Sequence, residues 1–113
     1  MITDLTYLET MAAGNEELKK EMIDIFIEQV NELVAEMEHY MDEKNWLALS
    51  KIAHKAKSSV AIMGMNNLAA DLKQLELIAK DGKDTDTYQE IIDRFGTECS
   101  QAVEELKSIT NNR

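Results

Sequence analysis

The chain is predicted to be all-α, an antiparallel up-down four-helix bundle with a short additional helix at its N-terminus. Proline is absent and glycine occurs only four times in 113 residues, which favours helices. Apolar residues recur at three- and four-residue steps through four long segments, and short connections join these segments. No segment shows the apolar and polar alternation of a strand. We expect a single domain over residues 1–113 with one modest core.

The first two helices are expected to begin at capping residues. Thr6, followed by Glu9, has the form of a capping box and starts a short helix that Gly14 should end. Asn15 then caps a long second helix, which should end near Glu43. Its predicted core face repeats at helical steps and comprises Leu18, Met22, Ile25, Phe26, Val30, Leu33, Met37 and Met41.

A third helix is predicted to open around Asn45 and to run towards Met63, where Gly64 is a natural break. Its apolar residues fall on one side of a helix and should form a buried stripe, which comprises Leu49, Ile52, Ala53, Ala56, Val60 and Met63.

The last two helices follow the same pattern. Asn66 is expected to cap the fourth, and residues 81–83 supply a turn after it. Thr87 and Glu90 form another possible capping box at the start of the fifth. The predicted core positions in these two helices are Leu68, Leu72, Leu75, Ile78 or Ala79, Tyr88, Ile91, Ile92, Phe95, Cys99, Val103 and Leu106.

Composition excludes several classes of function. A net charge of -10 argues against nucleic acid or anionic lipid as a partner, because both require an extended positive surface. The apolar runs are too short to span a bilayer, and no secretory segment follows Met1. The single Cys99 lies on an apolar stripe and is expected to be a buried, reduced thiol. We therefore expect a soluble cytoplasmic protein that is a monomer.

One stretch departs from the general acidity. No Asp or Glu occurs from Asn45 to Ala70, although the chain contains 22 of them. His54 lies in the middle of this window, and its side chain should point roughly 150° away from the buried stripe, towards water. A lone exposed imidazole in a locally basic window suggests a site for an anionic group, with a phosphoryl group as the leading candidate.

The residues around His54 leave room for another protein. Lys57, three residues later, is near enough to help hold a phosphoryl oxygen. The other neighbours one or two turns away are small or basic, and an apolar residue lies on the outward side of the same helix. The expected docking surface comprises Leu47, Ser50, Lys51, Lys55, Ser58, Ala61 and Gly64.

The segment resembles the signature of histidine-containing phosphotransfer (HPt) domains, which is H-x-x-K-G-S followed by a glycine ten residues after the histidine. His54, Lys57, Ser59 and Gly64 stand at the matching positions. Ser58 replaces the usual glycine, and its hydroxymethyl group narrows the space beside the imidazole. The similarity continues into the long acidic helix before this segment and the leucine-rich helix after it.

The resemblance implies a phosphorelay intermediate of two-component signalling. His54 would accept a phosphoryl group from the phospho-aspartate of one receiver domain and pass it to another, and Lys57 would offset phosphoryl charge. The implied partners are response-regulator receiver domains and a hybrid sensor histidine kinase. Mg²⁺ is expected in the partner receiver, and no cofactor or metal in this chain. The chain has no Gly-rich phosphate loop, so we expect a phosphocarrier without autokinase activity. Because the chain begins at Met1 and ends within a few residues of its last predicted helix, we expect a standalone carrier.

A non-catalytic helical-bundle adaptor is the alternative. Such a protein would bind a signalling partner through the same bundle without carrying phosphate. A metal site is a weaker alternative. Glu36 and His39 form one Glu-x-x-His motif, but di-iron bundles use two such motifs and the chain has no second copy. We therefore expect His39 to be an ordinary exposed residue.

Overall fold

The computed structural model describes residues 2–111, and these contain five α-helices and no strand. In chain order the elements are α1 (Thr6–Ala12), α2 (Glu16–Asp42), α3 (Trp46–Ile62), α4 (Asn66–Lys80), the 3₁₀ turn η1 (Thr85–Thr87) and α5 (Tyr88–Asn111). None of the helices in this part of the chain is both long and apolar enough to cross a membrane. The predicted all-α class is confirmed.

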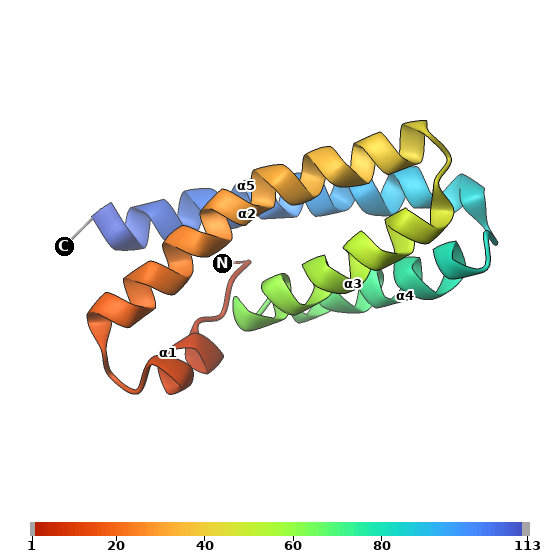
Figure 1. The fold of residues 1–113 in the computed structure, drawn as a ribbon. Coiled ribbons are helices and arrows are strands. Elements are labelled where there is room, and N and C mark those ends of the chain that lie inside the picture. The colour runs from red at the N-terminus through yellow and green to blue at the C-terminus, as the bar shows by residue number, and fades with distance from the viewer. Residues whose placement is uncertain (1, 112–113) are drawn as a thin grey trace.

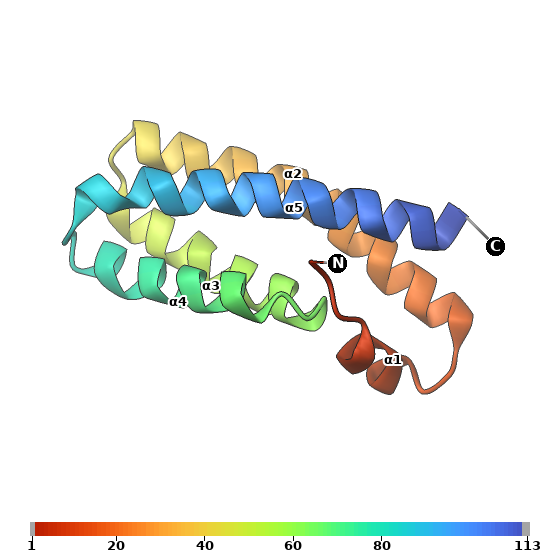
Figure 2. The same ribbon diagram turned by 180° about the vertical axis from the view of Figure 1, so that it is seen from behind.

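The four long helices form an elongated bundle (Figure 1), and the structure as a whole measures 44 × 21 × 20 Å. α2 and α5 lie side by side, and α3 and α4 form the other half of the bundle (Figure 2). With 27 and 24 residues, α2 and α5 are longer than α3 and α4, which have 17 and 15. The first part of α2 therefore extends beyond the end of α3, and α1 packs against this extension.

The core is built from the apolar stripes that periodicity identifies. All six residues of the predicted α3 stripe are buried, as are Leu68, Leu72, Leu75 and Ala79 of α4. Tyr88, Phe95 and Cys99 of α5 have no exposed surface, and burial raises the pKa of the Cys99 thiol to about 12. The expected buried, reduced cysteine is confirmed.

The predicted core face of α2 is wrong at two positions. Leu18 and Ile25 are 38% and 53% exposed, whereas Ile23 is fully buried. Periodicity alone cannot choose between apolar residues on either side of a broad stripe. Which of these residues is buried depends on the neighbouring helices. The first part of α2 packs against α1, whereas the rest of α2 packs against α3 and α5.

Asparagine caps two helices as predicted. The side chain of Asn15 accepts a hydrogen bond from the N–H of Leu18 at 3.0 Å, and that of Asn45 accepts one from Ala48 at 3.2 Å. Each cap satisfies one of the N–H groups that the first turn of a helix leaves unpaired. These two caps fix the starts of α2 and α3.

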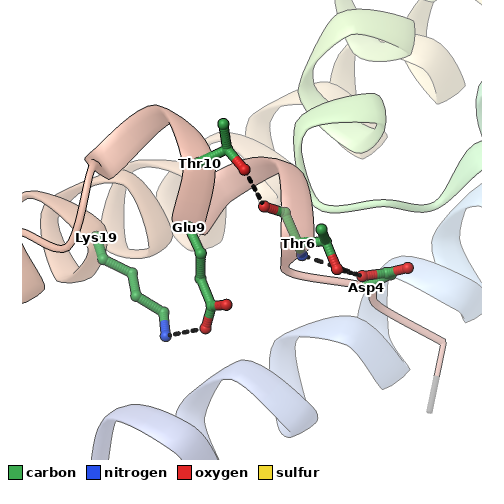
Figure 3. A network of polar contacts seen from close by, with 5 residues as sticks. All are labelled: Asp4, Thr6, Glu9, Thr10 and Lys19. Carbon is green, nitrogen blue, oxygen red and sulfur yellow. Dashed lines mark hydrogen bonds and ion pairs between the residues drawn. The ribbon is translucent and has the colours of Figure 1, made fainter.

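The capping box at Thr6 is not formed. Leu5 occupies the N-cap position of α1, and Asp4 accepts hydrogen bonds from both the N–H and the hydroxyl of Thr6, at 3.0 and 2.7 Å. Glu9 instead binds Lys19 of α2 at 2.9 Å (Figure 3). The carboxylate of Glu9 therefore joins α1 to α2 rather than closing the first turn of its own helix.

Two further predicted caps are also wrong. Asn66 is the first residue of α4, and Met65 is its N-cap, because the reversal after α3 takes up both Gly64, with φ +74°, and Met65. The hydroxyl of Thr87 donates to the carbonyl of Asp84 within η1, while Glu90 pairs with Arg94. Glu90 and Arg94 are one turn apart on α5, so this local ion pair takes the place of the predicted capping box.

We predict that Leu72→Ala lowers the free energy of unfolding by about 2–5 kcal/mol, because it leaves a cavity beneath α3. Leu77 is the matched control, since it lies on the same helix and is 56% exposed. Leu77→Ala should change stability by no more than about 0.5 kcal/mol. Denaturant unfolding followed by Trp46 fluorescence measures both, and equal losses in the two variants would contradict the described packing.

Candidate functional site

His54 lies on α3, with its side chain 63% exposed on the face opposite the buried stripe. The predicted exposure of this imidazole is confirmed. The buried residues on either side of it, Ala53 and Ala56, have small side chains and no exposed surface, so α3 is held close to its neighbours directly beneath the imidazole. The backbone that carries His54 is therefore rigid, while the ring itself faces solvent.

Glu76 on α4 contacts His54 and was not identified from the sequence. The Nδ1 atom of His54 lies 3.0 and 3.1 Å from the two carboxylate oxygens of Glu76. A carboxylate can only accept here, so the contact favours the tautomer with the proton on Nδ1 and leaves the Nε2 lone pair available. The two residues are 22 positions apart, and only the antiparallel pairing of α3 with α4 brings them together.

Lys57 completes a group of three charged or polar side chains. Its Nζ lies 3.6 Å from a carboxylate oxygen of Glu76, and its side chain is 27% exposed. Burial raises the pKa of Glu76, but the hydrogen bond from His54 and the positive charges of His54 and Lys57 outweigh it and lower the pKa below the ordinary 4.5. The ionised carboxylate thus stabilises the fold above about pH 4.5, and this contribution is lost as the pH falls further.

A shallow hollow of about 300 Å³ lies beside the imidazole. Its walls come from α3 and α4, and it is lined by Leu47, Ser50, Lys51, His54, Glu76 and Lys80. Lys80 was not predicted to belong to the site, because the sequence does not give the register of α4 against α3. Leu47 is 56% exposed and Lys51 is exposed, so both are accessible to a partner.

Two residues of the predicted docking surface have other roles. Ser50 is buried, and its hydroxyl donates to the main-chain carbonyl of Glu76 at 2.7 Å. It therefore joins α3 to α4, and the prediction that Ser50 is an accessible residue of the docking surface is wrong. Gly64 lies at the far end of α3, where a Cβ atom would come within 2.1 Å of the carbonyl oxygen of Asp4. Its missing side chain makes room for the N-terminal segment.

The other predicted surface residues face outwards. Lys55, Ser58 and Ala61 are all exposed on α3. Ser59 is half-buried, and its hydroxyl donates to the side-chain oxygen of Gln29 on α2 at 3.3 Å, so it ties these two helices together.

A second, larger hollow begins one turn from His54 and was not predicted. Two adjoining depressions, of about 750 and 280 Å³, share Ser58 and Ile62 as lining residues. Together they form what we call the α1–α3 groove, with α1 and the first part of α2 on one side and the end of α3 on the other. Its lining residues include Tyr7, Met22, Ile25, Ser58, Ala61 and Ile62.

Exposed apolar side chains are concentrated on the two helices that form one side of this groove. Of the six large apolar residues that are exposed in the described part of the chain, four lie on α1 and the beginning of α2, and these are Tyr7, Met11, Leu18 and Ile25. Soluble proteins rarely leave such residues clustered unless another molecule covers them. The sequence contained a weak indication of this surface, because α2 contains more apolar residues than one narrow buried stripe requires.

His39 lies at the other end of the bundle and contacts Glu43 rather than Glu36, the residue with which it forms the Glu-x-x-His motif. Its Nε2 atom is 2.9 Å from Glu43, one turn later on α2. Residues 2–111 contain no group of three or more His, Cys, Asp or Glu side chains arranged to hold a metal ion. His54, by contrast, has its Nδ1 atom on the carboxylate of Glu76, which the ammonium group of Lys57 also approaches.

Comparison with known proteins agrees with this geometry. A sequence model of the Hpt domain family, described as "Hpt domain", matches residues 21–109. The phosphorelay intermediate protein YPD1 of Candida albicans is 30% identical over 67 residues, which are 59% of this chain and 36% of YPD1. The chain thus matches only about a third of that relative's length.

The crystal structure of histidine-containing phosphotransfer protein B (HptB) from Pseudomonas aeruginosa PAO1 has a similar fold. The two structures align with a TM-score of 0.89 over 98% of this chain and 96% of HptB, at 21% sequence identity. This likeness confirms the four-helix bundle with its additional N-terminal helix.

We predict that neutral His54 carries its proton on Nδ1, because Glu76 accepts from that atom. His39 is an internal control with the opposite preference, since its Nε2 faces Glu43. Long-range ¹H–¹⁵N correlation spectra at about pH 9, above the ordinary imidazole pKa of about 6.5, distinguish the two tautomers. Glu76→Ala should remove the preference at His54 alone, and a native His54 protonated mainly on Nε2 would contradict the assignment.

Proposed function

The chain belongs to the Hpt domain family of two-component phosphotransfer, and from this premise we propose that it is a phosphorelay intermediate that carries its phosphoryl group on His54. The observation that carries the proposal is the contact between Glu76 and Nδ1, which leaves Nε2 of an exposed imidazole free to react. Nε2 would attack the phosphorus of a receiver's phospho-aspartate, so that the N–P bond forms as the P–O bond to aspartate breaks.

Glu76 and Lys57 would act at different moments of this transfer. When Nε2 bears the phosphoryl group and Nδ1 keeps its proton, the ring is positively charged, and the carboxylate of Glu76 stabilises that charge. Lys57, 3.6 Å from Glu76, is close enough to turn its ammonium group towards the phosphoryl oxygens. No general base is required, because Nε2 carries no proton in the favoured tautomer.

The α1–α3 groove is the surface on which we expect a receiver domain to dock. It begins at Ser58, one turn from His54, and offers the exposed apolar side chains that a protein interface requires at its centre. The hollow with Leu47 and Lys51 lies on the other side of the imidazole and would receive the partner's edge. A receiver seated on both would cover the reacting atoms.

Charge distribution favours approach from this side. α3 and α4 carry five lysines and two acidic residues, whereas α2 carries nine acidic residues and two lysines. The lysines of α3 and α4 would attract the acidic part of a partner towards His54 and raise the rate of encounter, while the part of the partner that lies against the α2 wall of the groove would be less acidic. The expected partners are receiver domains of response regulators and of a hybrid sensor histidine kinase, and the Mg²⁺ for transfer would lie in the receiver.

As a phosphorelay intermediate, the chain would depend on a separate kinase for its phosphoryl group. It would carry phosphate without autokinase activity, and we expect it to meet its partners in the cytoplasm as a monomer. A non-catalytic adaptor would use the same groove, but it would not require Glu76 to orient an exposed imidazole. The two functions therefore differ in whether a covalent label appears on His54.

We predict that a ³²P-labelled receiver domain with Mg²⁺ transfers its label to the native chain and not to His54→Gln. The label should be lost in acid and retained in alkali, as expected for a phosphoramidate on histidine. His39→Gln is the matched control and should accept as much label as the native chain. If the native chain binds receivers but takes no label from any of them, the adaptor function is correct instead.

We predict that Ile25→Asp raises the half-saturating receiver concentration by about tenfold, because a charge in the groove must be desolvated when the receiver docks. Ile25 is 53% exposed, so the bundle should remain folded. Leu77→Asp makes the same kind of change at a leucine that is 56% exposed and lines neither the groove nor the hollow. Equal effects of both substitutions on transfer would place docking elsewhere.

A further inference from the structure

Residues 2–4 are attached to the bundle at two points. The N–H of Ile2 donates to one carboxylate oxygen of Glu105 at 2.8 Å, and the N–H and hydroxyl of Thr3 donate to the other at 3.1 and 2.8 Å. The N–H of Asp4 then donates to the carbonyl of Met63 at 3.0 Å. The segment thus runs from α5 to the end of α3, and we call it the N-terminal anchor.

The carboxylate of Glu105 is the acceptor for three of these four contacts. Burial raises its pKa, but the hydrogen bonds from Ile2 and Thr3 outweigh burial and lower the pKa below the ordinary value of 4.5. Glu105 is therefore ionised at neutral pH. Thr3 is only 7% exposed, so its hydroxyl would lose its acceptor within the protein if Glu105 were removed.

Gly64 permits the second attachment. It has φ +74°, and a Cβ atom at this position would lie 2.1 Å from the carbonyl oxygen and 2.7 Å from the Cβ atom of Asp4. No rearrangement of a flexible side chain can relieve a contact with the main chain. Any larger residue at position 64 must therefore move the anchor away from the end of α3.

α1 depends on the anchor for its position. It packs on α2 through Leu8 and Ala12, and Glu9 binds Lys19 at 2.9 Å (Figure 3). On the side that faces α3 it is separated from that helix by the larger depression of the α1–α3 groove, about 750 Å³, which is lined by Asp4, Tyr7, Ser58 and Gly64 among others. Leu8 holds α1 in the core, and the anchor adds a second attachment that joins the start of α1 to α3 and α5.

We infer that Glu105 and Gly64 are positioning residues for partner docking, which act through the anchor and α1 to hold open the groove that receives the partner. This inference rests on the proposed function, since it concerns the docking step of the same transfer. Neither residue contacts His54, so the chemistry at Nε2 should not depend on them. Their effect should appear in the concentration of receiver that transfer requires and not in its rate at saturation.

The test measures transfer from a phosphorylated receiver domain to the full chain as a function of receiver concentration. Glu105→Ala removes the acceptor of the anchor, and Gly64→Ala displaces the anchor from α3. Both should raise the half-saturating receiver concentration by about tenfold and leave the saturating rate within about twofold of native.

Each variant has a matched control. Glu104→Ala removes the same charge from the neighbouring position, where the side chain is exposed. Gly82→Ala introduces the same strain at a positive φ of +65°, but its Cβ atom would meet only Trp46 at an ordinary 3.5 Å. Both controls should transfer with native parameters, so that an effect of charge or of backbone strain alone is separated from loss of the anchor.

Amide hydrogen exchange provides the second measurement. In Glu105→Ala, protection should fall in residues 3–12 and remain native in α3 and α4. Trp46 reports on the opposite end of the bundle, where it packs edge-on against Tyr88 with ring centroids 5.2 Å apart, and its fluorescence should not change. If the Trp46 fluorescence of Glu105→Ala shows that the whole bundle has unfolded, the same two measurements are made on Gly64→Ala.

The outcomes separate this inference from the function on which it rests. If the native chain takes no label, the proposed function fails. If the native chain is labelled and residues 3–12 lose protection in Glu105→Ala without any rise in the half-saturating concentration, α1 does not contribute to docking and the inference is wrong. It is also wrong if residues 3–12 keep their protection, because the anchor would then not hold α1.

Discussion

The packing of α4 against α3 is the constraint on which the rest of the site depends. Ala53 and Ala56 present small buried side chains to the bundle, so the two helices approach closely. The buried hydroxyl of Ser50 then binds the carbonyl of Glu76 and sets the register of one helix against the other. Because the register is set, the Glu76 carboxylate meets the imidazole of His54, and a shift of one residue along α4 would turn it away.

This arrangement places the imidazole of the proposed phosphoryl carrier on a rigid support without burying it. A histidine held by a loop would lose orientational freedom when a partner docked, whereas His54 already has its position defined by α3 and its ring orientation by Glu76. Three lysines on α3 lie close together in sequence and would repel one another in isolation. Glu76 relieves part of this repulsion through Lys57, so the carboxylate serves both the fold and the proposed chemistry.

The two sides of the imidazole differ in character. The part of the α1–α3 groove against α2 is lined mainly by apolar side chains such as Met22 and Ile25, while the hollow on the α4 side contains Lys51, Lys80 and Glu76. Apolar contacts supply affinity and charged contacts supply orientation and speed of encounter, so a partner that engages both sides would be held in one pose. The unequal lengths of the helices create this asymmetry, because the extension of α2 beyond α3 gives α1 a place to pack.

Sequence alone determined the helical class, most helix limits, the α3 stripe and the exposure of His54, since all of these follow from local periodicity, capping at Asn15 and Asn45, and breaks such as Gly64. Only tertiary structure decided the partners of side chains that could act locally or at a distance. Glu9 suits a capping box, yet it binds Lys19 of the neighbouring helix instead.

The same limit applies to the candidate site. Lys57 and His54 share one helix, so their spacing predicts that they lie close together, whereas Glu76, Lys80 and the groove depend on the register between helices. No local pattern specifies that register, because it results from how buried side chains of two helices interlock. For this reason Ile25 looked like a core residue and Gly64 like a surface residue until their neighbours were known.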